Sequence, residues 1–263
     1  LLLDHAMRQA LVEQRFRLHY QPQIDLASGD VIGAEALMRW RDPTLGDIPP
    51  GSFIPVAEET GFIVALGDWV LHEAVTRAAA WHADGRSLCV AVNVSALQFR
   101  QPGFVEGVAR VLHDAGLPAH LLELELTESI LIRDAEETLS RLEALAQLGV
   151  QLAIDDFGTG YSSLGYLKRL PIHRLKIDRS FVSGLPTDQS DAGIVNAIVN
   201  MGRALRLKVI AEGVENEAQR QFLLQAGCDQ FQGFLVAPAL DATKFEALFA
   251  QRGAARPGIR LVK

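Results

Sequence analysis

Acidic side chains recur in this sequence where short apolar runs end. Glu35 follows VIGA, Glu125 closes LLELE, Glu212 closes VIA, and the pair Asp155 and Asp156 follows LAI. If these runs are neighbouring strands, their carboxylates share one small volume. Carboxylates that close together cannot all ionise without compensation, so either some pKa values rise or cations bind. The pattern therefore predicts an acidic site with a cation-binding function.

The ligand types at these positions favour a hard cation. Asn93, at the end of VAVN, adds a neutral oxygen to the carboxylate set. None of the seven histidines falls in an HxH, HxxxH or HExxH spacing, which argues against a zinc site. An all-oxygen set suits Mg²⁺ or Mn²⁺.

The apolar runs are predicted strands, and most are separated by helix-length amphipathic stretches. The predicted strands are Phe16–Leu26, Val31–Trp40, Cys89–Val94, Leu121–Leu126, Val150–Asp155, Leu175–Asp178, Val209–Glu212 and Asp229–Val236. Helical patterns cover Ser52–His82, Gly103–Ala115, Asp134–Gly149, Asp191–Leu205, Glu217–Ala226 and Ala242–Gln251, with Asp134 and Glu137 spaced as a capping box.

This alternation predicts an α/β fold, a TIM-like (β/α)8 barrel. The short turn Ser28–Asp30 joins the first two strands, so one antiparallel strand is expected in an N-terminal hairpin. In such a barrel all parallel strands open at their C-terminal ends onto one face, where active sites are built. Residues far apart in the sequence would meet there.

Strand alternation assigns the side chains to faces. Along LELELT the leucines would face the helices, while Glu123, Glu125 and Thr127 face the barrel interior. Glu123 lies one pleat deeper than Glu125, and we expect it to be a buried, paired carboxylate. Asp155 and Asp156 are adjacent, so both reach the site only if the chain leaves the sheet between them, as the following glycines suggest.

Composition excludes several classes of protein. The chain has 263 residues, 49% hydrophobic and 22% charged, as in ordinary globular proteins. A net charge of −7 argues against binding of a DNA or RNA polymer. No apolar stretch approaches the ~20 residues of a membrane span, so no membrane contact is expected. Cys89 and Cys228 are isolated, which favours small core residues in a reduced, cytoplasmic protein.

Short motifs now point to a family. From YQP at Tyr20–Pro22 onward, the chain contains in order EALMRW, VNVS, ELELTES, DDFGTGYSSL, KIDRSF, AEGVE and QGF. The sequence resembles the bacterial EAL-domain phosphodiesterases, which hydrolyse cyclic di-GMP to linear pGpG, and the resemblance covers nearly the whole chain. We therefore expect residues 1–263 to be a single EAL-type domain. The abrupt start at Leu1 suggests a domain of a longer protein, which could be membrane-anchored elsewhere.

The resemblance implies two divalent cations, Mg²⁺ or Mn²⁺, with Ca²⁺ as an inhibitor. It assigns the first cation to Glu35, Asn93, Glu125 and Asp155; Asp155 would bridge to the second, with Asp156 and Glu212 nearby. Lys176 would position the attacking water or neutralise developing charge, and Asp178 would orient Lys176. Catalytic roles thus fall to Lys176, Glu212, Asp156 and Asp178. The alternatives for Lys176 are a structural ion-pair lysine or, on a different barrel, a Schiff-base nucleophile, which the carboxylates around it disfavour because they would keep its amine protonated.

The remaining assignments concern the substrate and a loop. Expected substrate contacts are Gln21, Leu37, Arg39, Gln232 and Glu215, although Arg39 could simply pair with an acid and Glu215 could be a helix-start residue. Glu128 is expected to hold the loop after Asp156 through backbone N–H groups, with a helix N-cap as its alternative. Tyr161, Ser162 and Ser163 would form a movable flap in that loop.

Two other functions remain open at this point. A non-catalytic cyclic di-GMP receptor would keep the fold, although such members usually lack one or more metal ligands. A different barrel enzyme, such as a metal-dependent lyase acting on small acids, is the other.

One departure from the family is that no basic residue follows QGF, where Leu235–Ala239 reads LVAPA. A homodimer and regulatory domains are expected in the full-length protein.

Overall fold

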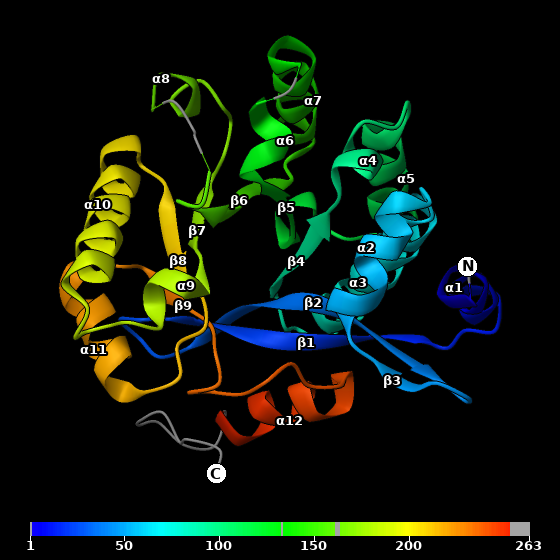
Figure 1. Cartoon of the computed structure of the whole chain (residues 1–263), viewed down its shortest axis with the longest axis horizontal. Coiled ribbons are helices and arrows are strands. Elements are labelled where there is room, and N and C mark those ends of the chain that lie inside the picture. Colours follow the sequence, from blue (N-terminus) through cyan, green and yellow to red (C-terminus); the bar gives the residue numbers. More distant parts are fainter. Residues whose placement is uncertain (1, 133, 161–163, 253–263) are drawn as a thin grey trace.

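The barrel is a single sheet closed on itself (Figure 1). The computed structural model describes residues 2–132, 134–160 and 164–252. Eight strands of the nine-stranded sheet form the ring in the order β1, β9, β8, β7, β6, β5, β4, β2, and β1 pairs with β2 to close it. Their bounds are β1 Phe16–Asp25, β2 Val31–Asp42, β4 Cys89–Val94, β5 Leu122–Thr127, β6 Gln151–Phe157, β7 Arg174–Ile177, β8 Lys208–Ala211 and β9 Gln230–Phe231.

One strand of the ring runs against the others. β1 pairs antiparallel with both of its neighbours, β2 and β9, whereas the other pairs around the ring are parallel. The predicted barrel with one antiparallel strand is confirmed. A short strand that the sequence did not reveal, β3 (Gly46–Ile48), pairs only with β2 and lies outside the ring.

Helices surround the sheet (Figure 1). They are α1 Leu2–Val12, α2 Pro50–Glu59, α3 Ile63–Ala83, α4 Ala96–Phe99, α5 Phe104–Ala115, α6 Glu128–Ile132, α7 Ala135–Leu148, α8 Leu164–Leu167, α9 Arg179–Val182, α10 Gln189–Leu205, α11 Glu217–Ala226 and α12 Ala242–Arg252. The predicted helical stretch Ser52–His82 is two helices, because Gly61 takes a left-handed φ of 73° between them.

The capping box predicted at Asp134 is wrong. Asp134 itself has a left-handed φ of 48°, and its side chain caps no backbone N–H. Glu137 instead accepts a hydrogen bond from Arg141. A capping box does form at α11, where Asn216 and Gln219 bond each other's backbone.

The two faces of the barrel strands differ in chemistry. In β5 the alternating leucines Leu122, Leu124 and Leu126 are buried in the apolar layer under the helices. Each such buried leucine contributes about 1.5–3 kcal/mol relative to an exposed one. Glu123 and Glu125 alternate with them and are equally buried, but inside the barrel. The predicted facing of the LELELT segment is therefore confirmed.

None of the helices that the structure describes is both long and apolar enough for a membrane crossing. Cys89 and Cys228 are free thiols packed into the barrel wall. Burial raises the pKa of both thiols to about 12.

Candidate functional site

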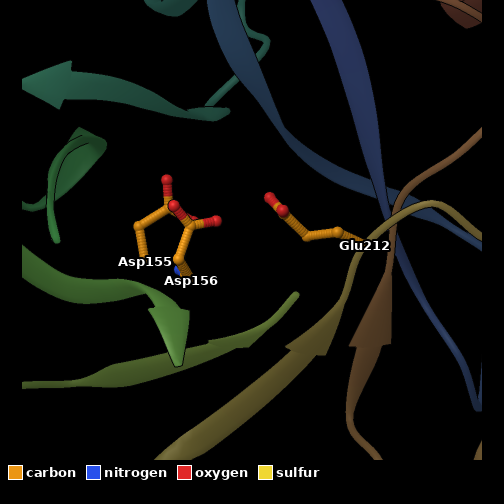
Figure 2. A group of neighbouring side chains, drawn as sticks. All are labelled: Asp155, Asp156 and Glu212. Carbon is orange, nitrogen blue, oxygen red and sulfur yellow. The ribbon is translucent and has the colours of Figure 1, made fainter. Parts of the chain in front are cut away.

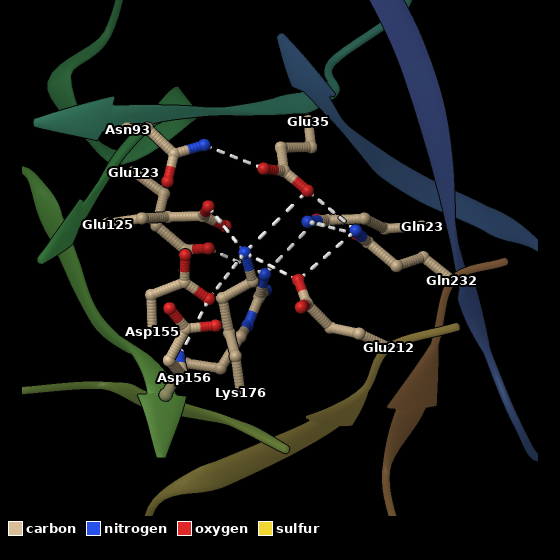
Figure 3. Close-up of polar contacts among 11 residues, drawn as sticks. Gln23, Glu35, Asn93, Glu123, Glu125, Asp155, Asp156, Lys176, Glu212 and Gln232 are labelled. Carbon is tan, nitrogen blue, oxygen red and sulfur yellow. Dashed lines mark hydrogen bonds and ion pairs between the residues drawn. The ribbon is translucent and has the colours of Figure 1, made fainter. Parts of the chain in front are cut away.

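Strand register brings the predicted acidic residues to one end of the barrel (Figure 3). Asn93 of β4 lies opposite Glu125 of β5, and Asp155 of β6 lies opposite Thr127 at the end of β5. Glu35 projects from β2 on the far side of β4. The side chains therefore come from neighbouring parallel strands and converge inside the mouth.

Lys176 of β7 stands at the centre of this group (Figure 3). Its side chain is 0% exposed, and its Nζ lies 2.5 Å from Glu125, 2.7 Å from Glu212, 3.1 Å from Asp155 and 3.6 Å from Glu35. A buried ammonium without partners would be very costly. Here the negative carboxylates balance the charge of the ammonium, and the ammonium balances part of theirs.

The charges set the protonation of the site. Burial opposes the charged form of Lys176, but the surrounding carboxylates outweigh it and raise the lysine pKa well above its usual range. Burial and the nearby Glu35 raise the pKa of Glu125, and burial raises that of Glu212 to about 8. Burial also acts on Glu35, yet Lys176 and two amide donors lower its pKa. The site thus holds more carboxylates than one ammonium can neutralise.

Two amides orient the Glu35 carboxylate. The Nδ2 of Asn93 donates to Oε1 at 2.7 Å, and the Nε2 of Gln232 donates to Oε2 at 2.6 Å. Gln232 also donates to Glu212 at 3.3 Å. Since Asn93 turns its nitrogen to Glu35, its carbonyl oxygen points away from that carboxylate and is available as a ligand.

Asp155, Asp156 and Glu212 form a second carboxylate group (Figure 2). One oxygen from each lies within 4.8 Å of the others. Contrary to the expectation, the chain does not leave the sheet between the two aspartates, because β6 continues to Phe157. Instead β6 is bulged between Ile154 and Phe157, and Asp156 adopts a left-handed φ of 52°. The bulge is what turns both carboxylates toward the site.

The donor set fits a divalent cation. Among the described residues, Oε1 of Glu125 is buried and has no hydrogen-bond partner, although its carboxyl group lies among other acids. Burial, together with Asp155, also raises the pKa of Asp156 to about 6. A hard cation that prefers oxygen ligands would coordinate the unpaired Glu125 oxygen and offset the excess negative charge of the carboxylates.

Two cavities open beside these carboxylates and share Asp155. One, of ≈ 370 Å³, is lined by Leu37 and Arg39 and reaches Asn93 and Asp156. The other, of ≈ 260 Å³, is lined by Gln21, Glu35, Glu212, Glu215 and Gln232. The expected substrate residues therefore fall into two groups on either side of the acidic centre.

Individual contacts refine the expected roles. Arg39 donates to the Met38 carbonyl at 2.8 Å and makes no ion pair among the described residues. Burial lowers its pKa, an effect that the charge of Glu35 only partly offsets. Glu215 forms a 2.7 Å ion pair with Arg179. Glu215 also lies two residues before α11, and its backbone N–H donates to Gln219 in the first turn of that helix at 2.8 Å, so both roles of Glu215 stay predictions.

Asp178 is not placed as expected. Its carboxylate accepts the backbone N–H of Ser180 at 3.0 Å and so caps α9. Within the part of the chain that the structure describes, it forms no ion pair with Lys176. The strand ends between Lys176 and Asp178, so the alternation that would place both on one face does not continue. The surrounding carboxylates orient the lysine instead.

Glu128 reaches the loop after β6. It is buried, and its Oε2 accepts the N–H of Gly160 at 3.1 Å. A Cβ added at Gly160 would lie 2.7 Å from that oxygen, so a larger residue there would force the Glu128 side chain to shift. Glu128 also begins α6, but its side chain serves the loop. Tyr161, Ser162 and Ser163, the expected flap, lie outside the described residues.

Two residues on the rim of the second cavity are not among the predicted site residues. They are Arg179 and Phe234, and Phe234 is 61% exposed. Both belong to quoted motifs, KIDRSF and QGF, where an arginine just past a strand and an aromatic residue after a glycine were the available signals. Gly233 permits this rim, because a Cβ there would meet the Val214 backbone at 2.2 Å.

Comparison with known protein families matches residues 4–239 to the EAL domain. A bifunctional diguanylate cyclase/cyclic di-GMP phosphodiesterase, MucR of Pseudomonas aeruginosa, is 51% identical over 255 residues, covering 95% of this chain and 37% of the relative. The cyclic di-GMP phosphodiesterase PdeR of Escherichia coli is 43% identical, covering 94% of this chain and 37% of its own length.

Among solved structures, one described as the PaMucR phosphodiesterase in complex with c-di-GMP is similar to this chain. The identity is 50% and the TM-score 0.90, with 93% of this chain and 100% of that one covered. This chain spans only 31% to 37% of the length of the first curated relatives it matches.

Proposed function

The chain belongs to the EAL domain family, and we propose that it hydrolyses cyclic di-GMP to linear pGpG with the help of two divalent cations. The observation that carries the proposal is the convergence of the expected ligands on one mouth of the barrel, where Glu35 and Glu125 are buried and the others lie closer to solvent: Glu35, Asn93, Glu125, Asp155, Asp156 and Glu212. Receptors that have lost the chemistry would be expected to lack part of this set.

The two cavities support a dinucleotide substrate. They meet at Asp155, so a ligand with two nucleoside halves can fill both while its phosphate lies at the carboxylates. The exposed ring of Phe234 offers a stacking surface for a base. Arg39 in one cavity and Arg179 in the other offer guanidinium donors to phosphate oxygens.

The cations would be held by the chain's own oxygens. Glu35, Asn93, Glu125 and Asp155 would hold one cation. Asp155, Asp156 and Glu212, whose oxygens lie within 4.8 Å of one another, would hold the other. Divalent cations, when bound there, would offset phosphate charge and lower the pKa of a water molecule. We propose Mg²⁺ or Mn²⁺, because the donors are all oxygen.

Side chains of this protein would carry the remaining steps. Lys176 keeps its proton because carboxylates surround it, so it can donate hydrogen bonds to the phosphate or to the attacking water. Asp156 is the more exposed aspartate of the pair and would accept the proton from that water. Gln232 and Asn93 keep Glu35 in a single orientation.

The test is incubation of the protein with cyclic di-GMP and either Mg²⁺ or Mn²⁺, followed by chromatography for pGpG. We expect turnover with both cations, none in excess EDTA, and inhibition by Ca²⁺, which binds at longer distances and with looser geometry than Mg²⁺. Full activity in EDTA would contradict the cation requirement.

The same experiment separates the alternatives. Tight binding of cyclic di-GMP without any pGpG, in either cation, would identify a receptor. Turnover of a small carboxylic acid with no effect on the dinucleotide would identify a lyase. We further propose that this is the phosphodiesterase domain of a longer, cytoplasmically facing regulatory protein, in keeping with the greater length of its relatives.

A further inference from the structure

We propose that Gln23, which lies beneath the site, is a positioning residue that fixes the orientation of the Gln232 amide and, through it, two of the carboxylates. Gln23 is 0% exposed in β1 and contributes nothing to either cavity lining. The inference rests on the proposed function, since it concerns the residues that would bind the cations.

A continuous chain of hydrogen bonds runs upward through Gln23 (Figure 3). The Nη1 of Arg174 donates to its Oε1 at 3.1 Å, and its Nε2 donates to the Oε1 of Gln232 at 3.2 Å. The Nε2 of Gln232 then donates to Glu35 at 2.6 Å and to Glu212 at 3.3 Å. These hydrogen bonds thus join the Arg174 guanidinium, deep in the barrel, to the carboxylates of Glu35 and Glu212 at the mouth.

The direction of this chain is determined by its two ends. A guanidinium can only donate, and an ionised carboxylate can only accept. The amides of Gln23 and Gln232 must therefore each turn the oxygen toward the Arg174 end and the nitrogen toward the carboxylate end. If Gln232 turned over, its carbonyl oxygen would face the Glu35 carboxylate in place of its N–H group, and like partial charges would meet. Gln23 prevents this by occupying the Gln232 oxygen with a donor.

The lower end is anchored in the barrel. Arg174 forms a 2.8 Å ion pair with Glu123, and both side chains are largely buried. This is the paired role expected for Glu123. Gly33, the register partner of Gln23, leaves room for the amide, because a Cβ there would lie 3.2 Å from the Gln23 oxygen and 2.5 Å from the Cys89 carbonyl.

Two substitutions separate orientation from packing. Gln23→Glu keeps the size and still accepts from Arg174, but it offers oxygen to Gln232 and so favours the turned-over amide. Gln23→Met fills similar space without demanding a donor. If Gln23 served only packing, the two variants would differ only through the added charge of the glutamate, which by itself attracts Mn²⁺ and would not weaken its binding. If it sets orientation, the glutamate is the more harmful.

The experiment measures the Mn²⁺ dissociation constant of the protein by competition with a fluorescent chelator, without substrate. We expect Gln23→Glu to weaken Mn²⁺ binding by roughly 10–100-fold, the usual effect of losing a partner behind a metal ligand, and Gln23→Met to weaken it less. Gln147→Glu, on the exposed surface of α7, adds the same charge and should match wild type. Melting temperatures in EDTA check that the variants fold.

The outcomes are distinguishable. Gln23→Glu with wild-type Mn²⁺ affinity, in a protein whose wild type binds Mn²⁺ and produces pGpG, would overturn the positioning role alone. Greater damage from methionine than from glutamate would also overturn it and leave a packing role. A wild type that binds no Mn²⁺ would overturn the proposed function and this inference with it.

Discussion

At the scale of single residues, the unusual feature is a lysine enclosed by acids. Lys176 lies within 3.6 Å of carboxylates from four different elements or loops of the barrel. Its ammonium is therefore part of what lets Glu35, Glu125 and Glu212 coexist. The same ammonium is placed where the phosphate of a substrate would approach, so its structural and catalytic contributions need to be separated by experiment.

Lys176→Met should lower kcat by roughly 10²–10³-fold, as loss of one preorganised donor does, while KM changes much less. The reason is that Lys176 lines neither of the two cavities that are proposed to bind the nucleoside halves. Steady-state kinetics in saturating Mn²⁺ measure this. Lys208→Met is the matched control, because Lys208 is exposed and pairs with Asp229 away from the mouth. An unchanged kcat with a raised KM would make Lys176 a phosphate anchor instead.

At the scale of elements, strand alternation predicted much of the site. β4 matches its predicted bounds, and β5 shows the expected division between leucines and glutamates. Periodicity could not predict the bulge in β6, because a bulge adds a residue without changing the apolar pattern. The capping of α9 by Asp178 was missed for a similar reason, since the strand ends one residue before it. Local backbone geometry, rather than pattern, decides these positions.

Glu128→Gln should leave the fold intact but lower kcat by about tenfold and weaken the binding of the second cation. The change removes the charge that strengthens the Gly160 N–H bond, and this bond holds the loop that continues from Asp156. Mn²⁺ titration of the activity and circular dichroism give the measurements. Glu143→Gln, on the exposed side of α7, is the control. Wild-type turnover with wild-type Mn²⁺ dependence would mean that the loop keeps its position without the Glu128 carboxylate.

At the scale of the whole molecule, the barrel encloses polar groups that are usually excluded from a core. Acidic residues line the interior, while the apolar layer lies between strands and helices. The barrel order was predictable from the spacing of apolar runs. The extent of the interior network was not, because Gln23, Arg174 and Gln232 lie far apart in the sequence and carry no motif in common.

Cation binding should stabilise the folded chain. A cation at about 100 times its dissociation constant adds roughly 2.7 kcal/mol, which corresponds to a rise of about 5–10 °C in melting temperature for a chain of this size. Thermal denaturation in EDTA and in Mg²⁺ gives the comparison. Glu35→Ala should lose most of the rise because it removes a ligand. An equal rise in that variant would place the cation elsewhere.

The two thiols should report on global unfolding. With pKa values of about 12, Cys89 and Cys228 hold almost no thiolate at pH 8. The thiolate is the reactive form, and an ordinary cysteine has a pKa near 8.5. Alkylation of the folded protein by iodoacetamide should therefore be about 10³-fold slower than in urea. Rapid labelling of Cys228 in the native protein would contradict its burial, whereas Cys89 is only half-buried.

The left-handed backbone at Asp156 limits which substitutions the fold tolerates at this position during evolution. Only glycine, asparagine and aspartate adopt that conformation readily, and a single base change in an aspartate codon yields either of the first two. Both replacements would keep the bulge while deleting a carboxylate. The genetic path from an enzyme to a protein that only senses its nucleotide is therefore short at this codon. Most other replacements at the same codon would disturb the backbone as well, so selection would more often remove them.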